Sequence, residues 1–409
     1  MTLPTASTPP GVYVEEIPSG PGPIQAVGTS TACFVGDALQ ANAYPNRAWA
    51  VNNWTEYTTT YQPSGSKQSN VLANAVYGFF QNGGTRCYIV NTAGQDNLAT
   101  ALAAAAVVDE IAIVAAPGMS DVASHEALIS HCELLKDRVA ILDTPEVVNP
   151  IERLMQVETA PAPPPTPTPS RSARRNAADG DDSDSGLRPR QSDGGFATVY
   201  FPWLTVLDPI TNSLINVPPS GHMAGVWART DATRGVAKAP ANETVSGALN
   251  LTYLLTPQQQ GELNGVGVNC CRLFATEGIR VWGARTLADQ SGTWRYLNVR
   301  RLFNMIEESI AEGTNWIVFE PNDQTLWKNI RRDIGAFLTR VWSDGGLMGA
   351  TPEEAFFVKC DEETNPQNVI DAGQVVAVIG IAPVKPAEFV TFQIMQSASG
   401  AEITAPAGG

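Results

Sequence analysis

Residues 85–118, "TRCYIVNTAGQDNLATALAAAAVVDEIAIVAAPG", alternate between two apolar runs and an Ala-rich run, and this alternation sets the fold class. The runs at 85–92 and 111–118 are short, apolar and rich in β-branched residues, which is typical of buried strands. The run at 96–110 between them is rich in Ala and Leu, which are good helix formers. A helix between two buried strands predicts a parallel sheet with covering helices.

The same pattern extends on both sides of this stretch. "TACFVGDA" (31–38) and "VAILDTPE" (139–146) predict further strands, and "SDVASHEALISHCELLKDR" (120–138) predicts a helix. The chain has 409 residues, which is more than one ordinary hydrophobic core accommodates. We therefore expect a mixed α/β, multi-domain protein.

The last third of the chain is the most regular part. Residues 298–313 predict an amphipathic helix ended by Gly313, because apolar residues recur there at helical spacing. A second helix at 323–343, capped by Asn322 or Asp323, would bury one apolar face. That face consists of Trp327, Ile330, Ile334, Phe337, Leu338 and Val341. Strands are expected at 315–320, 354–361 and 373–383.

The two ends of the chain resemble each other. "PPGVYVEEIP" (9–18) alternates like a strand, but its Pro- and Gly-rich surroundings offer it no partner nearby. "AEFVTFQIMQ" (387–396) is a second clean alternation, and it follows Pro386 closely. A lone strand leaves its backbone polar groups unpaired, so each segment should pair with a sheet elsewhere.

Composition excludes several classes of partner and site. The formal net charge of −15 argues against a nucleic-acid coat and against binding to an anionic membrane surface. No apolar run approaches the ~20 residues that a membrane-spanning helix needs. None of the six Cys forms a C-x-x-C pair, so we expect buried free thiols, as in a cytoplasmic protein.

Residues 158–195 interrupt the folded pattern. The segment combines a Pro-rich tract with acidic and basic clusters, and Leu187 is its one large aliphatic residue. Such a composition buries too little apolar surface to offset the entropy of ordering. We expect it to be disordered or a solvated loop.

No residue pattern indicates a catalytic site. His125 and His131 lie six positions apart on one predicted helix, so they face different ways and do not form a metal pair, and His222 lies elsewhere. Glu307 and Glu308 fit a solvated helix face. We expect no enzymatic activity, no metal and no cofactor. The alternative is an α/β enzyme centred on residues 85–146, since parallel sheets often bind ligands at their strand ends.

Six blocks of the chain, in order, resemble the contractile phage-tail sheath family. The resemblance is strongest to the sheaths of phage-tail-like, extracellular contractile injection systems. It is weakest over 37–160 and does not extend to 158–195. The blocks are residues 10–36, 201–209, 218–242, 278–287, 298–323 and 349–365.

The resemblance implies a structural role. Sheath subunits form stacked hexameric rings around an inner tube, and their contraction drives the tube through a target envelope. The implied partners are further copies of this chain, the inner tube protein, and baseplate and terminal cap proteins, with no nucleic acid and no direct membrane insertion. Assembly would take place in the bacterial cytoplasm, with release by lysis. Another tube or baseplate component is the alternative within this class.

The resemblance also implies a domain division. Residues 1–28 would be an arm, 29–275 an outer domain interrupted by 158–195, 276–386 an inner, tube-facing domain, and 387–409 a second arm. The inner domain, conserved in the family, would receive strands exchanged between subunits. The N-terminal strand would comprise Val12, Tyr13, Val14, Glu15, Glu16 and Ile17. The C-terminal strand would comprise Phe389, Val390, Thr391, Phe392, Gln393 and Ile394.

One helix face is a candidate for the tube contact. Three basic residues occur at i, i+3 and i+4 on the predicted 323–343 helix: Lys328, Arg331 and Arg332. The resemblance implies a charged tube interface, and this strip is unusual in an acidic chain. The alternative is a solvated helix face paired with Asp333. Arg300 and Arg301 on the preceding helix are the second candidates for the tube contact.

Overall fold

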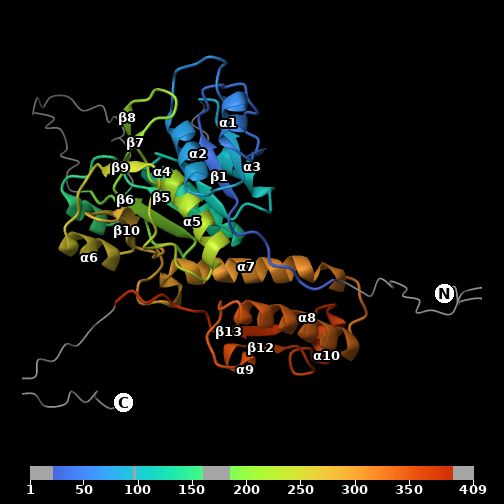
Figure 1. Ribbon diagram of the computed structural model, residues 1–409. Helices are drawn as coiled ribbons and strands as arrows, with labels where there is room; N and C mark the ends of the chain where they lie inside the picture. The colour runs from blue at the N-terminus through green and yellow to red at the C-terminus, as the bar shows by residue number, and fades with distance from the viewer. Residues whose placement is uncertain (1–21, 95–97, 160–184, 390–409) are drawn as a thin grey trace, which may run out of the picture.

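The computed structural model describes residues 22–94, 98–159 and 185–389. Its largest element is an eight-stranded sheet in the order β11-β10-β6-β5-β4-β1-β3-β2 (Figure 1). The five pairings from β10 to β3 are parallel, and the two edge strands pair antiparallel. The strands are β1 (Ala32–Gly36), β2 (Trp49–Val51), β3 (Cys87–Asn91), β4 (Ile113–Ala115), β5 (Val139–Asp143), β6 (Ala197–Phe201), β10 (Val268–Phe274) and β11 (Gly278–Val281). The predicted parallel sheet is therefore confirmed.

Helices cover both faces of this sheet. Side chains of β1 alternate between the two hydrophobic clusters: Phe34 belongs to one, and Cys33 and Val35 to the other. The first cluster includes residues of α1 (Trp54–Tyr61), α2 (Val71–Gln81) and α5 (Ser220–Arg234). The second includes residues of α3 (Leu98–Ala106), α4 (Val122–Leu135) and α6 (Pro257–Gly265). A smaller antiparallel sheet is formed by β7 (Leu204–Leu207), β8 (Leu214–Val217) and β9 (Ala248–Leu251). We call residues 32–287 the sheet body.

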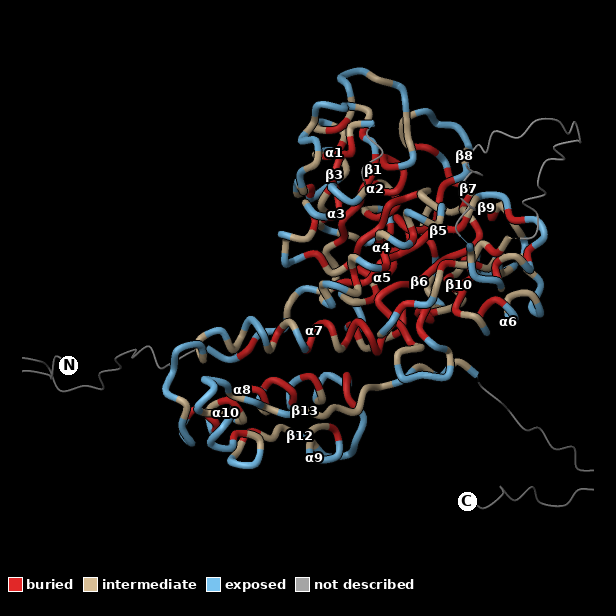
Figure 2. The backbone as a smooth tube through the Cα atoms, turned by 180° about the vertical axis from the view of Figure 1, so that it is seen from behind, coloured by how far each residue is buried: buried red, intermediate tan, exposed pale blue. Residues whose placement is uncertain are grey.

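A long helix, α7 (Leu297–Gly313), separates the sheet body from the rest of the described chain (Figure 1). Below it lies a compact unit, here called the α8 unit (residues 315–383), with its own hydrophobic cluster. Figure 2 shows buried backbone in the centre of the sheet body and also along α7. The α8 unit comprises α8 (Gln324–Ser343), α9 (Pro352–Ala355), β12 (Phe356–Lys359), α10 (Gln367–Asp371) and β13 (Val378–Ile381).

The two long helices were predicted from the sequence and are confirmed. The Asp323 side chain caps α8 by accepting a hydrogen bond from the backbone N–H of Leu326 at 2.8 Å. All six predicted apolar positions of α8 are buried. They pack against Leu302 and Ile306 of α7 in one cluster.

The strand predicted at 315–320 is wrong. Residues Asn315–Ile317 form a short 3-10 helix, and both Val318 and Phe319 are exposed. Phe319 adopts a left-handed backbone conformation with φ 71°, which a strand does not tolerate. The apolar run is short and ends at Pro321, and its residues are needed to turn the chain from α7 back along α8.

Two other predicted strands are shorter than expected. The one predicted at 373–383 is reduced to Val378–Ile381, and the one predicted at 354–361 is preceded by the turn of helix α9. The sheet body also extends past residue 275, because β11 at Gly278–Val281 pairs with β10.

The expectation of disorder is wrong for the end of the 158–195 segment. Residues 185–195 are described and ordered: the Arg188 N–H donates to the Gln156 carbonyl at 3.0 Å, and Leu187 packs against the second cluster. The Arg190 guanidinium pairs with Glu126 and Glu133 at 2.5 and 3.0 Å. Composition alone missed these residues because their order comes from contacts with distant parts of the chain. Residues 160–184 lie outside the described part.

Close packing of α2 against α5 depends on glycine and gives a first prediction. A Cβ at Gly221 would overlap the backbone carbonyl of Ala75, so Gly221→Ala should push the helices apart. We expect the free energy of unfolding to fall by about 1–3 kcal/mol, measured by urea denaturation. Gly261→Ala on α6 is the matched control, because nothing lies within 4 Å of its Cβ position. Equal effects of the two substitutions would contradict this account of the α2–α5 contact.

Candidate assembly interfaces

His125 and His222, two of the histidines considered for a catalytic or metal site, are buried in the protein interior. His125 is buried, with Nδ1 2.9 Å from Glu158 and Nε2 2.9 Å from the Asp143 carbonyl. His222 is fully buried, and burial lowers its pKa to about 4. Within the described ranges, no group of three or more His, Cys, Asp or Glu is placed to hold a metal ion. All six Cys are buried and free, as predicted.

Asp143, the last residue of β5, lies at the carboxyl end of the parallel sheet, where an enzyme would place a catalytic group, but its carboxylate is used in the fold. Asp143 accepts hydrogen bonds from the Ser220 N–H at 2.9 Å, the Ser220 hydroxyl at 2.6 Å and the Gly118 N–H at 3.0 Å. Burial raises the pKa of Asp143 to about 6, and these donors hold it lower than burial alone would. Its carboxylate thus joins the start of α5 to the sheet.

Among the helices of the described residues, none is both long and apolar enough to cross a membrane.

The N-terminal described segment is anchored at the carboxyl end of α7. Ile24 is buried, and a Cβ at Gly313 would come within 2.7 Å of its side chain. The N–H of Val27 donates to the Ser309 hydroxyl at 3.0 Å. From α8, the Arg340 guanidinium donates to the Ile24 carbonyl. Residues 24–27 therefore lie in a fixed path across the end of the helix.

The C-terminal described segment is anchored at the opposite end of α7. The Asn298 side chain, in the first turn of α7, donates to the Val384 carbonyl at 3.0 Å. Further on, the Glu388 carboxylate meets Arg285 of the sheet body at 2.6 Å. Asn298 and Ser309 are 11 residues apart on the helix, so these two anchoring side chains are separated by about 17 Å at 1.5 Å rise per residue. Figure 1 shows the blue and the red segments reaching opposite ends of α7.

A buried ion pair joins α7 to the sheet body. The Arg301 guanidinium contacts Asp231 of α5 in two bonds of 2.5 and 3.0 Å, and both side chains are at most 6% exposed. Arg301 also donates to the Thr29 carbonyl at 2.9 Å and lies 4.8 Å from the Trp227 ring. The Thr29 hydroxyl donates to Asp231 at 2.6 Å. The pair thus holds α5, α7 and the N-terminal segment together.

Arg300 and Arg301 are therefore wrong as surface candidates for a tube contact. The Arg300 guanidinium lies 4.5 Å from the Phe196 ring and 4.2 Å from the Trp294 ring, and it pairs with Glu307 at 3.2 Å. Both arginines are buried because α7 is covered by the sheet body on its polar side and by the α8 unit on its apolar side. The apolar residues of α7 predict only the face that packs on the α8 unit, and they do not reveal that the sheet body packs on the polar face.

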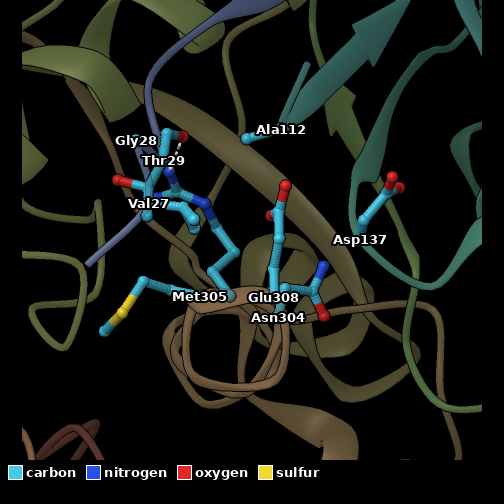
Figure 3. A pocket seen from close by; sticks show the side chains of 9 residues that line it. Val27, Gly28, Thr29, Ala112, Asp137, Asn304, Met305 and Glu308 are labelled. Carbon is cyan, nitrogen blue, oxygen red and sulfur yellow. Dashed lines mark hydrogen bonds between the residues drawn. The ribbon is translucent and has the colours of Figure 1, made fainter. Parts of the chain in front are cut away.

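A small cavity of about 10 Å³ lies where α7 meets the N-terminal segment and the sheet body. Figure 3 shows Glu308 rising from α7 towards Ala112 and Asp137, with Val27, Gly28 and Thr29 on the other side. Burial, together with the nearby carboxylates of Asp137 and Glu312, raises the pKa of Glu308 to about 7. The sequence predicted that Glu308 lies on a solvated helix face. This prediction is wrong, because its carboxyl group is half-buried beside the cavity.

The raised pKa of Glu308 gives a second prediction. The folded state holds this proton up to about pH 7, whereas the unfolded chain releases it near the ordinary value of 4.5. The stability contributed by the protonated form is present at acidic pH and lost as the pH rises through about 7. Glu308→Gln should therefore raise the free energy of unfolding by about 1–2 kcal/mol at pH 8, allowing for solvent screening, and change it little at pH 4.5.

Urea denaturation at the two pH values measures this effect. Glu320→Gln, an exposed residue in the turn between α7 and α8, is the matched control and should show no such pH dependence. An equal effect of Glu308→Gln at both pH values would contradict the assignment.

The basic strip on α8 is only partly a free surface. Lys328 and Arg332 are exposed, and Arg332 pairs with Asp333 at 2.9 Å, as the solvated-face alternative expects. Arg331 is half-buried and donates to the Cys360 carbonyl at the end of β12. The tube contact itself stays a prediction.

The predicted arm strands lie almost wholly outside the described residues. Val12–Ile17 and Val390–Ile394 are not described, and Phe389 is exposed. Among the described residues, β12 and β13 form a two-stranded antiparallel sheet. In the described part of the chain, neither Phe356–Lys359 nor Val378–Ile381 pairs with a third strand, and the segment around Leu347 meets the chain at Pro383, past the end of β13. Phe357 and Val378 leave apolar surface exposed beside the two strands.

Comparisons with known proteins agree on one family. Residues 192–287 match the model of the phage tail sheath protein central domain, and residues 289–397 match that of the phage tail sheath C-terminal domain. Tail sheath proteins of Vibrio phage KVP40 and Escherichia phage P2 are 31% and 26% identical over 189 and 201 residues. These matches cover 46% and 48% of this chain but only 27% and 48% of the relatives, so the chain spans half or less of their length.

Solved structures match over nearly the whole chain. The sheath of the PVC extracellular contractile injection system in its contracted state has a TM-score of 0.76 and 32% identity, covering 96% of this chain and 99% of that one. The contracted helical sheath of the anti-feeding prophage has a TM-score of 0.73 and 30% identity, covering 96% and 100%. The resemblance inferred from six blocks is confirmed: this chain belongs to the contractile tail sheath protein family.

Proposed function

We propose that this chain polymerises as stacked hexameric rings around an inner tube, and that the polymer contracts to drive the tube through a target envelope. The observation that carries the proposal is the match of 96% of the chain to subunits of contracted sheaths. Membership of a structural sheath family implies a non-enzymatic role. The work would come from interfaces that are larger or better packed in the contracted state, without a nucleotide or cofactor at the sheath. The sheath role is favoured over an α/β enzyme centred on 85–146 and over a different tube or baseplate component, because the family models and the contracted-sheath structures agree on a sheath subunit.

The arms would link the subunits. Residues 12–17 and 389–394 would each add a strand to a β12–β13 sheet of a neighbouring subunit, through main-chain hydrogen bonds. Each bond contributes about 1 kcal/mol, and many bonds along a polymer would keep subunits connected while they rotate. The open edges of the two-stranded sheet, and the exit of both described ends at α7, support this arrangement.

The α8 unit would face the tube. Lys328 and Arg332 are exposed basic residues on α8 and remain the candidates for this contact, with Arg331 contributing charge from a half-buried position. We place the start of this inner domain after residue 287, because β11 belongs to the sheet body and the C-terminal family model begins at residue 289.

The particle would also contain other proteins. One structural match is an anti-feeding prophage baseplate, which supports a baseplate partner here. An inner tube and a terminal cap complete the proposed assembly. Assembly in the bacterial cytoplasm and release by lysis would bring the particle to its target.

Negative-stain microscopy of the full-length chain, expressed with and without the inner tube protein, tests the proposal. Hollow cylinders with a regular axial repeat are the expected result. Dispersed monomers that bind a small molecule tightly would overturn it in favour of the enzyme alternative.

A further inference from the structure

The Glu388 carboxylate is held by an unusually complete set of donors. Arg285 meets it in two bonds, Nε to Oε1 at 2.8 Å and Nη2 to Oε2 at 2.6 Å. The Asn264 amide donates to Oε1 at 2.8 Å, and the Tyr296 hydroxyl lies 3.4 Å from Oε2. Paired bonds between a guanidinium and a carboxylate fix both distance and orientation. We call Glu388 with these three partners the Glu388 clasp.

The sheet-body side of the clasp is rigid. Arg285 is 7% exposed, and its Nη1 also donates to the Asn264 carbonyl at 2.9 Å. Its own backbone N–H donates to the Asn269 side chain at 2.7 Å, and its carbonyl accepts from the Thr198 hydroxyl at 2.9 Å. Asn269 and Thr198 are buried in β10 and β6. The guanidinium is therefore fixed relative to the sheet.

After Val384, the clasp is the main attachment of the described segment that carries Glu388. From residue 382 to residue 389 no side chain is buried, so hydrophobic packing does not fix its path. Its other anchors lie near its start. Ala382 donates to the Ala355 carbonyl at 2.9 Å and accepts from the Met348 N–H at 2.7 Å, and Val384 bonds to Gly346 at 3.3 Å and to the Asn298 side chain at 3.0 Å. Phe389, directly after the clasp, is 80% exposed. The clasp is thus the last strong attachment before residue 390.

The clasp lies where the chain passes from the α8 unit to the sheet body, so it can carry force between them. The clasp transfers the C-terminal segment from the α8 unit to the sheet body, at the amino end of α7. The N-terminal segment is held at the carboxyl end of the same helix by Ser309 and Arg340. The two exits are therefore fixed to opposite ends of one rigid helix.

We propose that the Glu388 clasp sets the direction in which the C-terminal arm leaves the subunit, and so determines which neighbour that arm reaches. The inference rests on the proposed function, in which the arms link subunits. Force pulled through one arm would pass along α7 to the other, with the clasp as the attachment at the C-terminal side. Hydrogen bonds from Arg285 and Asn264 outweigh the effect of burial and keep the pKa of Glu388 below its ordinary value, so the clasp stays charged at neutral pH.

Two measurements on the full-length Glu388→Ala variant test the proposal. Hydrogen–deuterium exchange of the Val384 amide, which donates to the Gly346 carbonyl, should speed up about tenfold, because the clasp no longer holds the segment that follows it. Sheaths seen by negative stain should become several-fold shorter or lose their connection. Circular dichroism should show that the subunit keeps its fold, with a lower melting temperature because the buried Arg285 guanidinium loses its charged partner. Glu388→Gln should give an intermediate effect, because the amide keeps one acceptor but not the charge.

Glu277→Ala is the matched control. It removes an exposed glutamate that pairs with Arg280 at 2.8 Å next to the same sheet edge, so it should leave exchange of the Val384 amide and sheath length as in the wild type. Wild-type exchange and wild-type sheath length in Glu388→Ala would overturn the proposal. Faster exchange with normal sheaths would show a local anchor that does not direct the arm, which also overturns it. If the wild-type chain forms no sheath, the proposed function fails first, and exchange still decides whether the clasp holds the segment.

Discussion

Replacing Arg301 with methionine is expected to lower the free energy of unfolding by about 3–5 kcal/mol, the largest stability effect of any substitution considered. Methionine preserves much of the side-chain volume but leaves the Asp231 carboxylate buried without its charged partner. It also removes the donor to the Thr29 carbonyl and the contact with Trp227. Urea denaturation followed by circular dichroism measures the loss.

Two further variants separate the ion pair from general damage to α7. Arg332→Met breaks an ion pair whose arginine is 68% exposed, so its effect should stay within about 0.5 kcal/mol. The double variant Arg301→Met with Asp231→Leu should recover most of the stability, because neither charge remains buried. A loss below about 1 kcal/mol for Arg301→Met alone would contradict the assigned role of the pair.

Deleting residues 1–21 is expected to abolish connected sheaths and to leave folded subunits. The described chain builds its three hydrophobic clusters without these residues, and the first buried side chain is Ile24. The proposed strand at 12–17 would be lost, and with it the main-chain hydrogen bonds to a neighbour. Circular dichroism should show an unchanged fold, and negative stain should show no long cylinders.

Deleting residues 160–184 is the matched control for that truncation. Glu158 and Gly186 form a β-bridge, so the ends flanking this deletion already lie side by side. Sheaths should form as in the wild type. Normal sheaths from the 1–21 deletion would show that the arm is not the linking element. Loss of folding in either variant would show instead that the deleted segment is needed for the subunit fold.

Local sequence patterns predicted the first half of the large sheet and the two long helices α7 and α8, but not helices α1, α2, α5 and α6. The strands and helices between residues 85 and 146 follow directly from apolar runs of the right length, and α8 begins at its predicted cap, Asp323. These features succeed because each depends on residues that are neighbours in the sequence.

Features that depend on distant contacts were not predictable. The polar side of α7 is buried because a second body packs on it, which made Arg300 and Arg301 structural residues. Residues 185–195 are ordered by partners such as Glu126 and Glu133, far away in the chain. The Glu388 clasp joins residues 103 positions apart, and neither Arg285 nor Glu388 stands out in its local sequence. The arms were predicted from unpartnered alternation and from the family resemblance and stay a prediction, whereas the contacts of residues 24–27 and 384–388 near α7 became visible only in the structure.

The most direct test of the central claim is a cryo-EM reconstruction of the sheath assembled from the full-length chain. The account predicts a hollow helical cylinder of six-membered rings in which residues 12–17 of one subunit form a strand beside β12 or β13 of another. Residues 389–394 of a further subunit should extend the same sheet. A reconstruction in which both segments pair within their own subunit, or a chain that forms no cylinder, would contradict it.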